Sequence, residues 1–156
     1  SYADSYSVRG LEASLGVSKT EVAAALKRCQ EVGLLRVSFQ TKLSIVNRKP
    51  LLDFVEYGLR FVVPVRPAEI TRGIPTSFAA PVLAGKLMSG GDIIYVWPDA
   101  YGNRKGQSVD PLFKSVPKAV KKDPLLYEYL ALIDAVRMGN SREARLAIEM
   151  LRDKVL

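Results

Sequence analysis

Hydrophobic residues recur at helical spacing in several parts of this chain, most clearly between residues 19 and 32. The side that they share at 3.6 residues per turn is formed by Val22, Ala25, Leu26 and Cys29. Ser18 precedes the run and Glu21 follows three residues later, which is the spacing of a capping box, and Gly33 is a stop signal. The pattern predicts a helix with one side in a core and the opposite side exposed.

A shorter helix is predicted immediately upstream. Ser7 can cap it, and it should run to about Ser14. Its inner side is formed by Val8, Leu11 and Leu15. Gly16 permits a sharp turn into the longer helix, with Val17 in the angle between the two. Two helices joined by a short glycine-containing turn make a helix-turn-helix.

A hairpin and a further helix are expected next. β-favouring residues occupy 36–46 on both sides of residues 40–42, so we expect a short hairpin whose tip lies there. Asn47 can cap a helix that has Pro50 in its first turn and ends near Gly58.

The middle of the chain has weaker patterns. Four prolines in residues 63–87 exclude a long helix or a central strand there, and the high apolar content excludes a disordered linker. We expect an extended packing segment, in which residues 72–76 are either a ligand loop or simply irregular. A strand is predicted over 92–98, with Trp97 as a core anchor. Residues 104–122 are expected to form a loop.

The C-terminal end is clearer. Asp123 and Pro124 are a cap and a first-turn proline for a helix over 125–138, and Ser141 caps a second helix that continues to the end. The two form a helical hairpin that either closes the core or offers a dimer surface.

Charge points to a polyanionic partner. The net charge is +7 and the pI about 9.6, and residues 104–122 carry six basic and one acidic group. Nucleic acid is the first candidate for such a partner and a membrane surface the second, and ordinary solubility is the alternative explanation of the charge. A basic connector over 104–122 can follow a phosphate backbone or be merely solvated.

Residue types exclude much of the usual site chemistry. Histidine is absent and Cys29 is the single cysteine, so we expect no metal site, no cofactor and no catalysis. The polar groups near the loops have no acid–base spacing: Asp92, Asp99, Asp110 and Lys105. One cysteine, no signal-peptide layout and no membrane-length apolar run predict a cytoplasmic protein that does not use a membrane.

The N-terminal quarter resembles the winged helix-turn-helix regulators of bacteria and archaea, broadly the MarR- and ArsR-like group. The residues that carry the resemblance are Leu11, Leu15-Gly16-Val17-Ser18, Val22, Leu26 and Gly33-Leu34-Leu35. In that group the second helix of the pair lies in the DNA major groove. The resemblance therefore implies that the following residues face DNA: Ser18, Lys19, Thr20, Ala23, Ala24, Lys27 and Arg28.

The hairpin at 36–46 takes the place of the wing. Arg36 on its flank and Lys42 at its tip are then expected near phosphates or a minor groove. A helix normally precedes the pair in that group. Here it is missing, is replaced, or lies before Ser1.

These patterns predict an α+β, mostly helical fold. It comprises a winged-helix-like region (1–60), an irregular segment with a short strand (61–122) and a helical hairpin (123–156). The leading hypothesis is a non-catalytic, sequence-specific transcriptional regulator that binds double-stranded DNA, with a homodimer as one arrangement. The alternative is a protein-interaction module, such as an antitoxin or accessory subunit, that uses the helix-turn-helix and the proline-rich segment to bind a protein partner.

Overall fold

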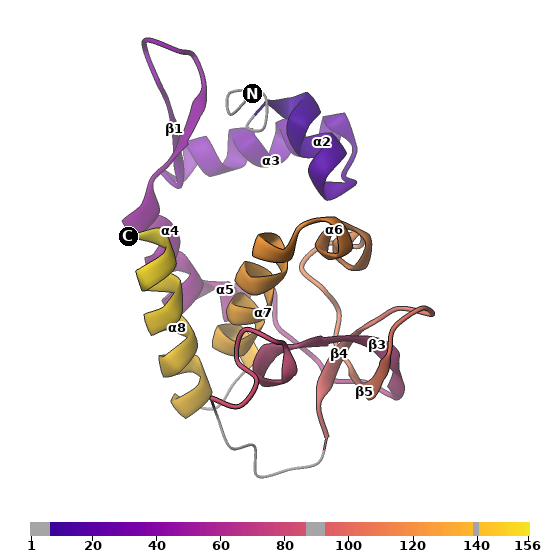
Figure 1. Cartoon of the computed structure of the whole chain (residues 1–156). Coiled ribbons are helices and arrows are strands. Elements are labelled where there is room, and N and C mark those ends of the chain that lie inside the picture. The colour runs from indigo at the N-terminus through magenta and orange to yellow at the C-terminus, as the bar shows by residue number, and fades with distance from the viewer. Residues whose placement is uncertain (1–6, 87–92, 139–140) are drawn as a thin grey trace. The chain divides into compact units, whose positions relative to one another are not determined.

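The computed structural model describes residues 7–86, 93–138 and 141–156, and it is an α+β fold in which helix predominates (Figure 1). The chain divides into two compact units, Ser1–Leu51 and Leu52–Leu156, called here the N-terminal and C-terminal units. The expected boundaries at residues 60 and 122 differ from this division, because the middle segment and the last two helices belong to one unit. No helix of the described residues has the length and apolarity needed to cross a bilayer.

Two helices open the N-terminal unit, where the capping signals predict them. They are α2, Val8–Leu15, and α3, Lys19–Glu31. The Ser7 hydroxyl accepts a hydrogen bond from the Gly10 N–H at 3.0 Å and so caps α2. Gly16 ends α2 with φ 68, a left-handed conformation that glycine adopts without steric cost. The turn between the helices is therefore encoded locally.

A two-stranded antiparallel hairpin follows, as expected. Its strands are β1, Leu35–Val37, and β2, Ser44–Val46. The tip is closed by the Lys42 N–H, which donates to the Ser38 carbonyl at 2.9 Å. The predicted tip at residues 40–42 lies within this turn.

The next helical stretch is longer than predicted. α4, Arg48–Asp53, continues through a π-helical turn, Phe54–Gly58, into α5, Leu59–Val62. The prediction that helix ends near Gly58 is therefore wrong. The Phe54 ring lies 3.1 Å from the point where a Cβ on Gly58 would be, so the glycine lets the ring pack on the helix while the wider π turn carries the backbone onward.

Three short strands form a small closed barrel in the C-terminal unit. They are β3, Ile70–Thr76, β4, Tyr95–Pro98, and β5, Arg104–Ser108, and each pairs with the other two. The expectation that prolines exclude a central strand from 63–87 is wrong. β3 pairs with β5 through its first half and with β4 through its second, so Pro75 has a single neighbouring strand to satisfy. Of the β3 residues, Gly73 alone is in register with both neighbours.

The interior of this barrel is crowded, which explains why β5 lacks a strand-like sequence. A Cβ at Gly106 would lie 2.6 Å from the Ile94 carbonyl oxygen, and one at Gly73 would collide with the Trp97 carbonyl. The buried position of β5 therefore holds glycine, and the strand lacks the alternating apolar residues that usually mark one. The prediction of a loop over 104–122 is wrong, because the segment contains β5 and the short helix α6, Val116–Lys122.

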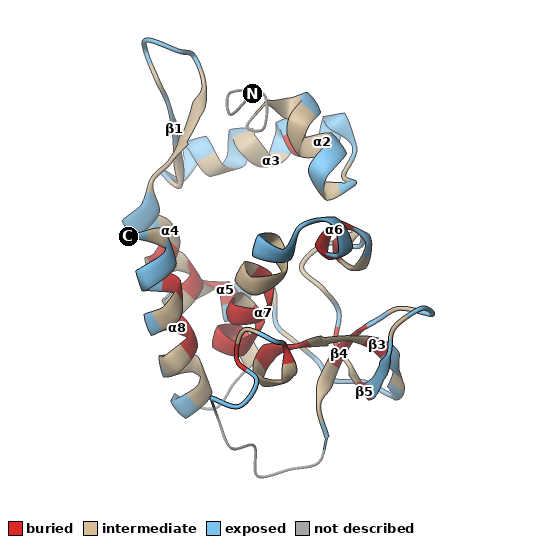
Figure 2. Ribbon diagram, viewed as in Figure 1, coloured by how far each residue is buried: buried red, intermediate tan, exposed pale blue. Residues whose placement is uncertain are grey.

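The last two helices form the predicted hairpin and close the core. α7 spans Pro124–Met138, with the Asp123 carboxylate accepting from the Leu126 N–H at 3.0 Å, and α8 spans Ser141–Val155. The linking residues 139 and 140 lie outside the described part. Trp97 is 1% exposed, as expected of a core anchor. Figure 2 shows the buried residues concentrated on α7, the inner side of α8 and the barrel, whereas the N-terminal unit is mostly exposed.

Candidate nucleic-acid interface

Helix α3 is anchored at its first turn and along one side. The Ser18 hydroxyl accepts a hydrogen bond from the Glu21 N–H at 3.2 Å, which is the first half of the predicted capping box. Val22 is 5% exposed and is the buried residue of the helix. The rest of the expected stripe is only half-buried: Ala25, Leu26 and Cys29. The N-terminal unit is small and buries little of this stripe.

All nine residues predicted to face DNA are solvent-exposed. Seven come from the cap and the outer side of α3, and two from the hairpin: Ser18, Lys19, Thr20, Ala23, Ala24, Lys27, Arg28, Arg36 and Lys42. On α3, at 100° per residue, Thr20 and Ala24 lie about 160° and Lys27 about 140° from Val22, whereas Lys19 in the first turn lies about 60° from it. The outer face thus has Ala24 near its centre and Ala23 on its flank, and these small side chains permit close approach of a partner's backbone.

The charge of this face is positive but not uniform. Lys19, Lys27 and Arg28 supply cations, and the N-terminal end of α3 adds the positive end of the helix dipole. Glu31 lies on the same side at the last turn, and Glu21 lies on its flank. An anionic partner is therefore favoured over the first three turns and disfavoured at the C-terminal end.

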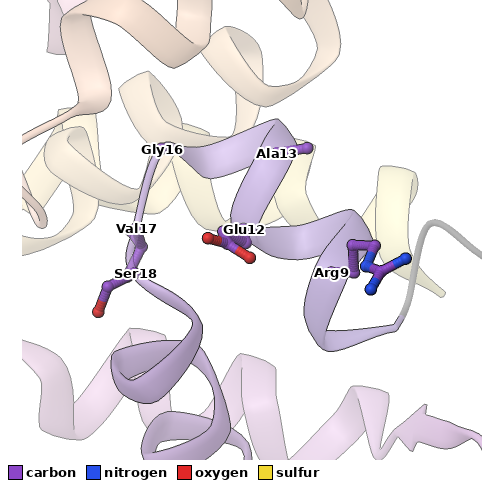
Figure 3. Close-up of a pocket in the computed structure, with 6 residues that line it drawn as sticks. All are labelled: Arg9, Glu12, Ala13, Gly16, Val17 and Ser18. Carbon is purple, nitrogen blue, oxygen red and sulfur yellow. The ribbon is translucent and has the colours of Figure 1, made fainter.

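A shallow hollow of about 480 Å³ adjoins the start of α3 (Figure 3). It is lined by Arg9, Glu12, Ala13, Gly16, Val17 and Ser18. Figure 3 shows the Arg9 side chain projecting away from the turn, whereas Glu12 lies beside it. Because Glu12 would repel an anion, the hollow is a poor pocket for a small phosphate. Arg9 extends the basic surface beyond the residues predicted to face DNA. Its position on the outer side of α2 is the feature from which the sequence could have identified it.

The hairpin residues have more local roles than expected. The Arg36 guanidinium donates to the Asn47 side-chain oxygen at 2.6 Å, and the Asn47 amide donates to the Gly33 carbonyl at 2.8 Å. Asn47 therefore joins the base of the hairpin to the end of α3 instead of capping α4 with its side chain. Lys42, with φ 60, is held in the tight turn at the hairpin tip and remains exposed.

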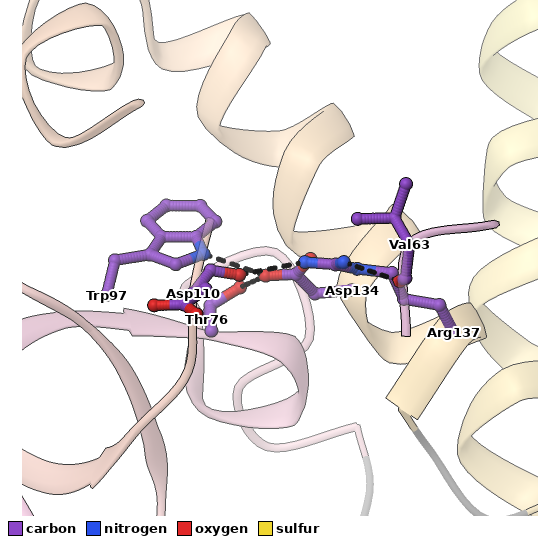
Figure 4. Close-up of polar contacts among 6 residues, drawn as sticks. All are labelled: Val63, Thr76, Trp97, Asp110, Asp134 and Arg137. Atoms are coloured by element: carbon purple, nitrogen blue, oxygen red, sulfur yellow. Dashed lines mark hydrogen bonds and ion pairs between the residues drawn. The ribbon is translucent and has the colours of Figure 1, made fainter. Parts of the chain in front are cut away.

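A buried polar cluster in the C-terminal unit was not predicted (Figure 4). Asp134 accepts hydrogen bonds from the Thr76 hydroxyl at 2.7 Å and the Trp97 indole N–H at 2.8 Å, and it pairs with Arg137 at 2.9 Å. Arg137 also donates to the carbonyls of Val63 and Asp110. Both charged side chains are 1% exposed. The cluster ties α7 to the barrel, and no strong periodic signal marks it because both residues lie within the apolar run of α7.

Burial raises the pKa values of two acidic groups in this region, Asp134 and Tyr127. It raises the pKa of Asp134, while Arg137 and the bonds from Thr76 and Trp97 act in the opposite direction. Burial also raises the pKa of Tyr127 to about 12, and its hydroxyl donates to the Pro75 carbonyl at 2.6 Å. Every oxygen of Asp134 is engaged within the protein, which is the arrangement of a structural cluster.

The groups considered for acid–base work do not converge. Asp99 pairs with Lys121 at 2.5 Å, and the hydrogen bond from Lys121 lowers the pKa of Asp99. Lys105 is exposed on β5, and Asp92 lies outside the described residues. Within the described ranges no three His, Cys, Asp or Glu side chains gather in a way that could hold a metal ion.

The chain matches no protein-family model, no curated protein and no solved structure with which it was compared. The fold and the placement of side chains are therefore the basis for inferring a function.

Proposed function

We propose that the N-terminal unit binds double-stranded DNA and that the protein is a non-catalytic, sequence-specific transcriptional regulator. The observation that carries this proposal is the outer face of α3, where Thr20, Ala24 and Lys27 are exposed while Val22 is buried on the opposite side. A helix of this diameter fits the major groove, and its exposed hydroxyls, amides and cations match phosphates and guanine edges.

The hairpin and α2 supply flanking contacts in this proposal. Lys42 at the hairpin tip and Arg9 on α2 are both exposed, so each can reach a phosphate beside the groove that α3 occupies. Residues 1–51 carry eight basic and four acidic groups, and this excess supports attraction to a polyanion.

The test begins with selection of a preferred duplex from a random library, followed by gel shift on the selected site. Lys27→Ala and Thr20→Ala should weaken binding by about 1–3 kcal/mol if either side chain reads a base edge, and by less for a lone phosphate contact. Both residues are exposed, so their effect on the free energy of unfolding should stay within about 0.5 kcal/mol. Arg145→Ala on α8 is the charge-matched control and should bind like the parent.

Salt dependence gives an independent readout. The logarithm of the binding constant should fall linearly with the logarithm of salt concentration, by roughly 0.9 per phosphate contact. Removal of Lys27 should reduce this slope by about one contact if it meets a phosphate. If no duplex is selected, or if Lys27→Ala and Thr20→Ala both bind like the parent, α3 is not a recognition helix.

A protein-interaction module is the second candidate, and exposed apolar side chains favour it. In the C-terminal unit Tyr57, Phe61 and Val62 are 66%, 80% and 68% exposed, and Phe39 at the hairpin turn of the N-terminal unit is 93% exposed. Large apolar groups at such exposure mark protein contact surfaces when they adjoin one another. Co-purification of a stoichiometric protein from the native host, lost in the Phe61→Ser variant, would favour this function over the regulator.

A further inference from the structure

The turn between β4 and β5 in the C-terminal unit is held rigidly. The Asp99 N–H donates to the Arg72 carbonyl at 3.1 Å, and the Gly102 N–H donates to the Asp99 carbonyl at 3.0 Å. The Arg72 guanidinium donates in turn to the Gly102 carbonyl at 3.2 Å. A Cβ on Gly102 would collide with the backbone of Gly73, so the turn is pressed directly against β3. Its conformation is fixed before any partner binds.

This fixed turn presents an aromatic ring to solvent. Tyr101 is 90% exposed, although its N–H is bound to the Asp99 carboxylate at 3.2 Å. The Lys121 ammonium lies 5.9 Å from the centre of the ring and also pairs with Asp99. Lys121 thus neutralises the one carboxylate of the turn, and an anion approaching Tyr101 is not repelled by it. Because the backbone that carries the ring is already hydrogen-bonded in place, a partner that stacks on Tyr101 need not order the turn.

Cations flank the turn that carries this ring. Arg72 on β3 and Lys105 on β5 are directly opposite in register, share one face of the paired strands and are both exposed. Arg104, which is also exposed, begins β5 on the opposite face, next to the turn. Like charges directly opposite on paired strands are destabilising. Lysine often protects a free strand edge, but these two residues lie on strands that pair with each other. An anionic ligand between them would relieve the repulsion.

We propose that this surface, formed by Arg72, Tyr101, Arg104 and Lys105, binds single-stranded nucleic acid. Arg72 and Lys105, on one face of the strands, hold neighbouring phosphates, Arg104 adds positive charge beside the turn, and an unpaired base stacks on Tyr101. A groove of cations with an exposed aromatic ring is how sequence-tolerant single-strand sites are built. A duplex would use the cations but leave the ring without a role, since its bases are already stacked. The site lies on different elements from α3 and does not depend on the duplex function proposed above.

The experiment uses the full chain carrying Lys27→Ala and Arg28→Ala, so that the proposed duplex face contributes little. Fluorescence anisotropy at low salt compares a labelled mixed-sequence single strand with the duplex of the same sequence. The single strand should bind, Tyr101→Leu should weaken its binding about tenfold, and Tyr101→Phe should keep it because the ring remains. Arg104→Ala with Lys105→Ala should weaken binding and lower the salt slope by roughly 0.7 per lost phosphate contact.

The matched control is the pair Arg66→Ala and Arg145→Ala, which changes the net charge equally at exposed positions elsewhere in the unit. It should leave single-strand binding nearly unchanged. Equal losses in the control pair and in Arg104→Ala with Lys105→Ala would show a net-charge effect and overturn the site. So would unchanged binding in Tyr101→Leu, or preference for the duplex. Circular dichroism confirms folding of each variant, and the duplex function is scored separately on chains with Lys27 and Arg28 intact.

Discussion

Replacing Asp134 by asparagine tests the role assigned to the buried polar cluster. In the native protein one carboxylate oxygen accepts from Thr76 and Trp97, and the other faces Arg137. Asparagine has nearly the same shape but presents an NH₂ group to one of these two sets of donors. It also leaves the Arg137 guanidinium buried without a counter-charge.

The expected loss of stability follows from the burial of the Asp134–Arg137 ion pair. Breaking a buried ion pair by removing one partner costs about 3–5 kcal/mol. A single domain is stabilised by about 5–15 kcal/mol in total, so Asp134→Asn should remove a large part of the stability of the C-terminal unit. The pair of Glu128 and Lys154 at the surface is a control, because the Lys154 and Glu128 side chains are 28% and 41% exposed, against 1% for Asp134 and Arg137. Glu128→Gln should cost no more than about 1 kcal/mol.

Urea denaturation followed by tryptophan fluorescence is a suitable assay. The chain has a single tryptophan, Trp97, and its indole N–H is bound to Asp134. The signal therefore reports on the unit that carries the cluster. A loss below about 1 kcal/mol in Asp134→Asn, similar to that in Glu128→Gln, would refute the view that the cluster holds α7 on the barrel.

Two further predictions concern the same unit. The pKa of Tyr127 lies at about 12 in the folded state, above its ordinary value of 10.0, so folding favours the neutral phenol. This contribution is fully present below about pH 10 and is lost as pH rises through about 12, and Tyr127→Phe should flatten that alkaline loss of stability when denaturation is repeated across the range. Gly106→Ala places a methyl group 2.6 Å from the Ile94 carbonyl oxygen and should destabilise the barrel by roughly 1–3 kcal/mol in the same assay. If Gly106→Ala leaves the free energy of unfolding unchanged, the strands of the barrel move apart readily to accommodate the methyl group.

The sequence by itself was sufficient wherever the signal lies within a few neighbouring residues. Ser7, Ser18 and Asp123 cap helices through their own side chains, and Gly16 turns the chain where a left-handed residue is needed. The position of Val22 on the apolar side of its helix was enough to predict which face of α3 is exposed. These features depend on hydrogen bonds between residues three or four positions apart. They can therefore be predicted from the sequence without knowledge of the rest of the fold.

Tertiary structure decided the features that join residues far apart in the chain. The strand β5 exists because Gly106 and Gly73 allow three backbones to approach closely, which no apolar alternation announces. Asp134 was hidden in an apolar helix because its partners Thr76 and Trp97 are 58 and 37 residues away. The surface around Tyr101 likewise depends on Arg72, whose guanidinium reaches the turn across 30 residues. Such contacts form only when the free energy gained by packing exceeds the entropic cost of closing long loops. The pattern of residues along the chain does not show whether this condition is met.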